Sequence, residues 1–539
     1  MQDTHARSEA PLGPGVVRSP RRGPVRATLL LLTLLLAACG GEDGPPTGVN
    51  PGPTPTPVRP TLPTTYTATG LGASGAVSVQ LFEWAWADVA RECELHLGPM
   101  GYEAALVSPP QEHIGGAAWW TRYQPVSYSL AQTRGGTRAQ FADMVTRCAA
   151  AGVDIYVDAV INHMTGGNGT GSNGTVYTKY SYPGLYGAGD FHTACGIVDW
   201  GSPAQVQDCE LVGLADLRTG SSSVQQKIVD YLADLVGLGV AGFRIDAAKH
   251  IQPVELDSIM SKLGRAAVGL GKPRPYVFLE VIDMGDYGVK ATDYYGIGHA
   301  GGSGSDISEF KFRGIGDKFL GVGGQKVSDL ATFSQSAWGL MPSDKALTFV
   351  QNHDTQRSGG LRWTDGDMAR LANVFMLTDP YGYPMIMSGY AFDPTTGAGR
   401  DAGPPAGNGT AAGQTCATTM ASAAVGTWVC EHRDPWLRPL IRFRKAVKGT
   451  ARTANWNDGA QAVAFSRGDQ GFVVINNATA SITVTIPTGL AAGTYCDLLT
   501  GGKVGAGCAG TSHTVAANGA LAVTLGARSA VVLLVGDQP

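Results

Sequence analysis

The chain has 539 residues, a formal net charge of −4 and 16% charged residues. This length is enough for a large core and two to four domains, and an α/β barrel alone can use most of it. No basic run follows the N-terminal segment, which argues against a nucleic-acid partner, and we expect the chain to work as a monomer.

The first 74 residues predict a targeting segment followed by a tether. Several arginines precede a leucine-rich stretch, Leu29 to Leu36, that is too short to span a membrane as a mature helix. Leu36-Ala-Ala-Cys39 resembles a bacterial lipobox with a lipid on the Cys39 sulfur; an ordinary cleaved signal with a chance cysteine is the alternative. We expect a signal peptide at 1–38 and a Pro/Thr/Gly-rich tether at 39–74. The protein is then exported, and is either lipid-anchored at the bacterial envelope, on the outer membrane, or secreted.

Eight cysteines remain beside Cys39, and an even number in an exported protein predicts four disulfides. Sequence alone does not fix the connectivity. Three local pairs are plausible and leave a fourth: Cys195 with Cys209, Cys416 with Cys430, Cys496 with Cys508, and then Cys93 with Cys148.

Strands that alternate with helical stretches predict parallel βαβ units. We expect strands at 77–82, 102–107, 155–161, 240–247, 276–281, 346–350 and 384–387, and helices near 86–97, 141–148, 224–236, 254–263 and 368–377. A count near eight strands favours a closed (β/α)8 TIM barrel over an open sheet.

Two parts of the chain depart from this alternation. Some sixty residues rich in Gly, Asn and Tyr separate Ile161 from Val224, a length typical of a functional insertion. After about Val447, short β-branched strands between turns predict an antiparallel β-sandwich. We expect the catalytic barrel at 75–163 and 217–446, a loop-rich inserted subdomain after the third strand at 164–216, and a C-terminal β domain at 447–539.

Charged and polar side chains gather where four predicted strands end. Arg244 and Asp246 lie two residues apart and therefore share one face of their strand. Asp158-Ala-Val-Ile-Asn-His163, Glu280 and Gln351-Asn-His-Asp354 close three others. One such pair alone can be a structural ion pair. In a closed barrel, however, these ends meet on one face, and this recurrence predicts a catalytic cleft.

Seven motifs, in order along the chain, resemble those of the α-amylases in the large glycoside hydrolase family with a catalytic barrel, and within it the branch that contains the animal α-amylases. The motifs are Gln80-Leu-Phe-Glu-Trp84, Val107-Ser-Pro-Pro110, Trp119-Trp-Thr-Arg-Tyr-Gln-Pro125, Asp158 to His163, Gly242 to His250, Glu280-Val-Ile-Asp283 and Asn352-His-Asp354. The resemblance extends from about residue 77 to 533. It implies endo-acting hydrolysis of α-1,4-glucosidic bonds in starch or related polymers.

The resemblance also implies a retaining mechanism, with one carboxylate as nucleophile and one carboxylic acid as proton donor. It assigns the nucleophile to Asp246, the proton donor to Glu280, and the binding and distortion of the sugar to Asp354. Arg244 is expected to keep Asp246 ionised and aimed. The residues expected to contact sugar are Trp120, Tyr123, Gln124, His163, Arg244, Lys249, His250 and His353.

A structural calcium ion is implied by the same resemblance. Its oxygen ligands fall on Asn162 and Asp216 and on the main-chain carbonyls of Gln207 and His250, and oxygen ligands suit Ca²⁺. Turn capping is the commoner use of Asn and Asp. Animal members bind chloride through an arginine, an asparagine and a further basic residue. Arg244 and Asn352 are present, but Met385 holds the third position, so no chloride is expected.

Three functions remain open at this stage. The first is hydrolysis of starch or maltooligosaccharides. The second is a transglycosylase or a maltooligosaccharide-forming amylase, because shared motifs do not separate water from sugar acceptors. The third is a surface lipoprotein that only binds starch; it would be expected to lack one of the three carboxylates, and all three are present.

Overall fold

The computed structural model describes residues 62, 65–285, 287–298, 303–405 and 414–539. The predicted lipidation site Cys39, the signal peptide and most of the tether lie outside these residues. Within the described ranges, no helix combines the length and the apolar character that crossing a membrane requires.

Eight parallel strands close into a barrel, in the order β1-β2-β5-β8-β9-β10-β11-β12 and back to β1, which confirms the predicted TIM barrel. Seven of the eight were predicted from sequence. The eighth, β10, spans three residues, Asp306-Ile-Ser308, and carries too short an apolar run to be recognised. The other bounds are β1 Ser78–Leu81, β2 Ala104–Val107, β5 Asp154–Ala159, β8 Gly242–Ile245, β9 Tyr276–Leu279, β11 Ala346–Thr348 and β12 Tyr383–Ser388.

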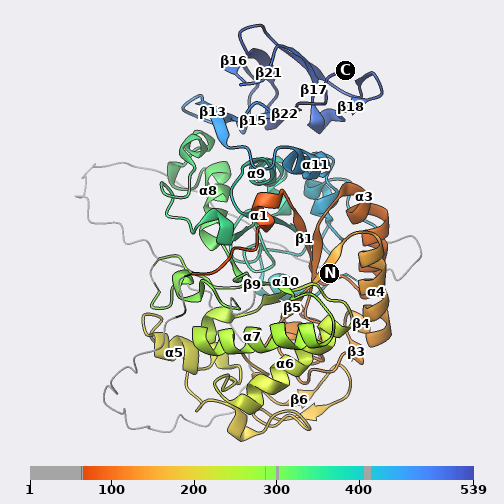
Figure 1. Ribbon diagram of the computed structural model, residues 1–539, viewed down its shortest axis with the longest axis vertical. Coiled ribbons are helices and arrows are strands. Elements are labelled where there is room, and N and C mark those ends of the chain that lie inside the picture. Colours follow the sequence, from red (N-terminus) through yellow and green to blue (C-terminus); the bar gives the residue numbers. More distant parts are fainter. Residues whose placement is uncertain (1–61, 63–64, 286, 299–302, 406–413) are drawn as a thin grey trace, which may run out of the picture. The chain divides into compact units, whose positions relative to one another are not determined.

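Amphipathic helices surround these strands (Figure 1). Helix α6 buries Val224, Ile228, Leu232 and Leu235, a spacing that places them on one face. The predicted helix 86–97 is divided: α2 ends at Glu92, a π-helical turn follows at Cys93–Leu97, and α3 begins at Gly98. The longer helices are α2 Trp86–Glu92, α4 Arg138–Ala150, α6 Ser222–Gly237, α7 Pro253–Gly269, α8 Gly314–Leu320, α9 Asp367–Thr378 and α11 Arg438–Ala446.

The insertion between β5 and α6 is loop-rich, as predicted. It holds two short strands, β6 Gly169–Thr170 and β7 Val176–Tyr177, and the helix α5 Pro203–Asp208. All four predicted disulfide pairs are present: Cys93–Cys148, Cys195–Cys209, Cys416–Cys430 and Cys496–Cys508.

The C-terminal part is an antiparallel β domain of two four-stranded sheets, as predicted. Apolar side chains such as Phe472, Ile486 and Leu521 fill the core of this domain. The first sheet is β13 Arg452–Asn457, β14 Ala462–Arg467, β15 Gly471–Asn476 and β22 Ser529–Leu534. The second is β16 Ile482–Pro487, β21 Ala520–Leu525, β20 Ser512–Val515 and β17 Gly493–Cys496.

Residues 65–74, which the sequence assigns to the tether, are folded onto the barrel. The Thr69 hydroxyl lies 2.9 and 3.1 Å from the two carboxylate oxygens of Asp306. The main-chain N–H of Gly304 donates to the carbonyl of Thr67, and helix α1 follows at Leu71–Ser74. Since Asp306 is the first residue of β10, this segment, here called the N-terminal strap, lies at the N-terminal ends of the strands.

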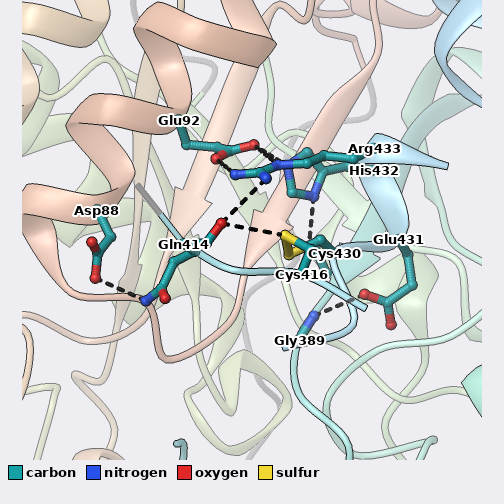
Figure 2. Close-up of a disulfide and its surroundings, with 10 residues drawn as sticks. Asp88, Glu92, Gly389, Gln414, Cys416, Cys430, Glu431, His432 and Arg433 are labelled. Atoms are coloured by element: carbon teal, nitrogen blue, oxygen red, sulfur yellow. Dashed lines mark hydrogen bonds and ion pairs between the residues drawn. A yellow bond between two sulfur atoms is a disulfide. The ribbon is translucent and has the colours of Figure 1, made fainter. Parts of the chain in front are cut away.

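The chain after β12 is fastened to α2 beside the disulfide Cys416–Cys430 (Figure 2). The buried Glu92 carboxylate binds His432 Nε2 at 2.6 Å and the Arg433 guanidinium. The Gln414 amide donates to Asp88 at 2.8 Å. These contacts hold the segment after β12 against α2.

Candidate active site

A cluster of three carboxylates around one arginine lies at the C-terminal ends of neighbouring strands. Asp158 is in β5, Arg244 in β8, and Asp246 and Glu280 directly follow β8 and β9. Arg244 Nη1 donates to Asp158 and, at 3.0 Å, to Asp246. Arg244 Nη2 lies 2.7 Å from Glu280, and all four residues are buried. Adjacent nitrogens of one guanidinium thus hold the two carboxyls predicted to be nucleophile and acid.

Charge is unbalanced within this cluster. Burial raises the pKa of Asp246 well above its usual range; Arg244 opposes this, and Glu280 and Asp158 add to it. Burial also raises the pKa of Asp158 despite its contact with Arg244. Arg244 thus favours the ionised form of Asp246, as expected, while burial and the neighbouring carboxyls act against it.

Asp354 reaches the same face from the end of β11. The Asn352 side-chain oxygen accepts hydrogen bonds from the main-chain N–H of Asp354 at 3.0 Å and of Thr355 at 2.8 Å, which turns the chain sharply. The Asp354 carboxylate lies 3.2 Å from His353 Nε2 and keeps 36% of its side-chain surface open. Loss of hydration on burial, together with the negative charge of Glu280, raises the pKa of Asp354 to about 7.

Aromatic and polar side chains support this face. The His353 ring stacks between Phe82, with a centroid distance of 4.8 Å, and Tyr123, at 5.2 Å. The Tyr123 hydroxyl donates to Asp158 at 2.8 Å, and the ring is only 9% exposed, so its stacked face is covered by His353. Trp120 is half-buried, and its indole N–H has no protein partner.

The other predicted sugar contacts surround the cluster and are held by main-chain groups. His163 Nε2 lies 2.9 Å from the Tyr123 carbonyl, and burial lowers its pKa to about 4. The Gln124 side-chain oxygen accepts from the N–H of Gly166 at 3.0 Å. Lys249 donates to the Ile282 carbonyl at 2.9 Å, and its ammonium lies 3.3 Å from the centroid of the Tyr287 ring.

The residues predicted to hold calcium meet in two pairs. Asn162 and Asp216 belong to adjacent segments, because His163 bridges to Asp216 and the Asn162 carbonyl accepts from Leu217. His250 Nδ1 lies 2.7 Å from the carbonyl of Val206, next to Gln207, whose side-chain oxygen is buried without a protein partner. No group of three or more His, Cys, Asp or Glu side chains in the described residues is arranged to hold a metal. A cation here would depend on amide and carbonyl oxygens.

Two residues without a predicted role belong to the site. Asp158 takes the third position on Arg244, and Gln80 Nε2 lies 3.0 Å from His353 Nδ1. Both fall inside motifs quoted above, at the ends of β5 and β1. That position is the only signal in the sequence that could have identified them, because their contacts depend on how the strands are paired.

Known proteins of similar sequence and structure identify the family of the chain. Residues 455–536 match the family described as alpha amylase, C-terminal all-beta domain. The chain is 41% identical over 478 residues to the pancreatic alpha-amylase of Sus scrofa, covering 83% of this chain and 91% of that protein. It is 40% identical to an alpha-amylase of Tribolium castaneum, with coverage of 84% and 91%. A solved complex of a mutant alpha-amylase I from Eisenia fetida with maltohexaose has a TM-score of 0.77 and 34% identity, covering 85% of this chain and 97% of the other.

Proposed function

The chain belongs to the α-amylase family of glycoside hydrolases, and we propose that the carboxyls around Arg244 carry out its chemistry. The protein is an α-amylase that hydrolyses internal α-1,4-glucosidic bonds of starch and related polysaccharides. The observation that carries the proposed mechanism is the placement of Asp246 and Glu280 on adjacent nitrogens of Arg244. Two carboxyls held this near each other suit a retaining enzyme, in which they stand about 5 Å apart.

In the first proposed step, Asp246 attacks the anomeric carbon while Glu280 gives its proton to the departing glycosidic oxygen. In the second step, Glu280 takes a proton from water, whose oxygen attacks the same carbon and releases Asp246. The first step requires a proton on Glu280 and an ionised Asp246. Asp354 accepts hydrogen bonds from sugar hydroxyls and holds the ring in its distorted form.

The assignment is tested by comparing two leaving groups. On soluble starch, in a reducing-sugar assay, Asp246→Asn and Glu280→Gln should each lose roughly four or more orders of magnitude in rate. On an α-maltooligosyl fluoride, whose leaving group needs no proton, Glu280→Gln should recover much of its activity and Asp246→Asn should not. Equal behaviour of the two variants would refute the roles. If the mechanism is retaining, NMR should detect the α-anomer of the hydrolysis product first. Products longer than the maltooligosaccharide substrate would reveal transglycosylation.

A structural calcium ion is proposed for Asn162, Asp216, Gln207 and His250. The donor set is neutral oxygen plus one carboxylate, which suits Ca²⁺, and the buried side-chain oxygen of Gln207, which has no protein partner, is a further oxygen beside the main-chain ligand. The ion would fasten the insertion to the barrel and supply no chemistry to the reaction. Because a ligand bound only by the folded state stabilises it, chelation should lower the melting temperature. An unchanged melting temperature in metal-free protein would exclude the site.

We propose that chloride does not activate this enzyme. The space beside Asn352 and Met385 measures about 20 Å³, enough for one water molecule, and Arg244, the cation that lines it, already serves three carboxylates. An anion there would lack the positive charge that offsets its loss of hydration. Activity in chloride-free buffer should therefore not rise several-fold when sodium chloride replaces sodium nitrate at equal ionic strength.

We also propose export and a lipid anchor on Cys39. The support is the Leu36-Ala-Ala-Cys39 sequence after a short leucine-rich segment. In bacterial cells, Cys39→Ala should move the protein from the membrane fraction to the soluble fraction without reducing starch hydrolysis. An unchanged distribution would leave an ordinary secretion signal as the explanation.

A further inference from the structure

The Arg357 guanidinium connects three segments at the catalytic face, and the mechanism above gives it no role. It lies three residues after Asp354. Its Nη1 donates to the His353 carbonyl at 2.5 Å, its Nε to the Arg400 carbonyl at 3.0 Å, and its Nη2 to the Tyr390 hydroxyl at 3.1 Å. Each of its three nitrogens therefore binds a different part of the chain.

Four aromatic rings surround the same cation. The Arg357 Cζ lies 4.3 Å from the ring centroid of Phe392, 4.6 Å from Trp119, 5.3 Å from Phe82 and 5.7 Å from Tyr390. A planar guanidinium can stack on ring faces and donate in its own plane at the same time, which a lysine ammonium cannot do. The surroundings of this residue are thus built for arginine.

Arg357 also joins the two loops at the rim of the face. One loop follows β2 and carries Trp119, whose indole N–H donates to the Arg400 carbonyl at 3.1 Å, the acceptor that Arg357 also uses. The other follows β12 and carries α10 Gly397–Asp401. The loops approach so closely at Gly403 that a Cβ there would lie 1.8 Å from the Ala117 carbonyl oxygen.

We propose that Arg357 is a positioning residue for starch hydrolysis, an inference that rests on the role proposed above for Asp354. By holding the His353 carbonyl against the two rim loops, it fixes the turn that presents Asp354 to the sugar. It acts through Asp354 and takes no part in bond making. A shift of about 1 Å in such a group can lower the rate roughly 100-fold.

The charge of Arg357 supports the same role. Burial and Glu280 raise the pKa of Asp354 to about 7, while Arg244 and Arg357 lower it. The titratable and charged groups around this carboxylate are Arg244, Arg357, Asp158, Asp246, Glu280, His353 and Tyr123. Loss of one of the two cations raises the pKa of Asp354 further. The ionised form that accepts sugar hydroxyls then appears only at higher pH.

The test compares Arg357→Met, Arg357→Lys and Tyr390→Phe with wild type, in kcat, KM and the pH profile of kcat/KM on maltooligosaccharides. Arg357→Met should lower kcat/KM roughly 10- to 100-fold and move the acid limb of the profile to higher pH. Arg357→Lys keeps the charge, so it should leave the limb in place while kcat falls. Tyr390→Phe removes a single hydroxyl and should lower kcat by a smaller factor.

Arg370→Met is the matched control. Arg370 also stacks on an aromatic ring, 4.7 Å from the centroid of Trp436, and binds Asp434 and Asp367. It should lower the melting temperature while leaving kcat, KM and the pH profile unchanged. If the Arg357 variants behave in the same way, Arg357 is merely structural and the proposal is wrong. Should Arg357→Met not fold, the lysine and Tyr390 variants decide it. An active Asp354→Asn would instead refute the role of Asp354.

Discussion

At the scale of single residues, the electrostatics of the cleft depend on Arg244. One guanidinium binds the carboxyls of Asp158, Asp246 and Glu280, so three carboxyls share a single positive charge. The histidines cannot supply the proton, because burial lowers the pKa of His163 to about 4 and that of His353 well below its usual range. In this enzyme, therefore, carboxyl groups and not histidines donate and accept the proton.

This argument predicts a particular pH profile. The pKa of Asp354 is raised to about 7 by burial and by Glu280, so its ionised fraction falls as pH drops through that value. We expect kcat/KM to decline from about pH 8 towards pH 6. Asp354→Asn should lose most activity, and its residual activity should lack this limb. A limb that persists unchanged in the variant would assign the ionisation to another group.

The sequence predicted which residues belong to the site, but it did not predict which of them contact one another. Strand ends marked Arg244, Asp246 and Glu280, because a parallel barrel brings these ends together. Nothing in the sequence placed Asp158 on Arg244 or Arg357 among four rings, since those contacts depend on the pairing of strands and on loops that meet across the face. Tyr123 is a further example: the sequence predicted a contact with sugar, and it did not predict that the His353 ring covers one face of the Tyr123 ring.

At the scale of elements, a buried carboxylate on α2, that of Glu92, binds the segment after β12. Burial alone would raise the pKa of Glu92, but hydrogen bonds from Arg433 and His432 lower it to about 2. The stability that these contacts contribute is present above the ordinary pKa of Glu92, 4.5, and is lost only as pH falls through about 2.

Glu92→Gln should therefore destabilise the protein at neutral pH by roughly 3–5 kcal/mol, because it removes the buried counter-charge of the Arg433 guanidinium. The measurement is urea unfolding. Glu94→Gln is the matched control: Glu94 also binds an arginine, Arg147, through both oxygens, but its side chain is 36% exposed. That pair should contribute no more than about 1 kcal/mol. Equal losses would show that burial does not decide the effect.

The N-terminal strap predicts a pH dependence of the opposite sign. Burial raises the pKa of Asp306 from 3.8 to about 7, although Thr69 and Tyr276 donate hydrogen bonds to it. Its contribution to stability is complete below about pH 4 and is lost as pH rises through about 7. The melting temperature of wild type should fall between pH 5 and pH 8 more steeply than that of Asp306→Asn. Parallel curves would contradict this.

Secondary structure was predictable wherever periodicity was strong. Seven barrel strands and the main helices followed from apolar spacing, while β10 did not, because three residues contain too little pattern. The helix from Trp86 was expected to run unbroken to about Leu97. Instead it passes into a π-helical turn at Cys93, where Cys93 is bonded to Cys148 on α4, a constraint that local propensity does not express.

At the scale of the whole molecule, the barrel and the C-terminal domain are joined by buried polar contacts. Arg467 of β14 donates to the carbonyls of Thr378, Val447 and Thr450. Arg452 of β13 lies 3.3 Å from the buried Asp379, directly after α9. Such contacts bind carbonyl groups that would otherwise be buried without a partner.

We expect the two domains to unfold together. Arg467→Met removes the side-chain donor to the carbonyl of the buried Thr378, at a cost of about 1–3 kcal/mol, and should lower the stability of both domains. Calorimetry should show a single transition in wild type and in the variant, at a lower temperature in the latter. Lys503→Met, an exposed change in the same domain, should leave the transition in place. Two separate transitions in wild type would refute the coupling.

The N-terminal strap lies on the side of the barrel opposite the cleft. Thr69 is bound to Asp306 at the N-terminal ends of the strands, whereas Asp246, Glu280 and Asp354 lie at or beyond their C-terminal ends. The length of the barrel strands therefore separates the strap from the catalytic carboxyls. A substitution at Thr69 should for this reason change the stability of the barrel and leave the hydrolysis of starch unaltered.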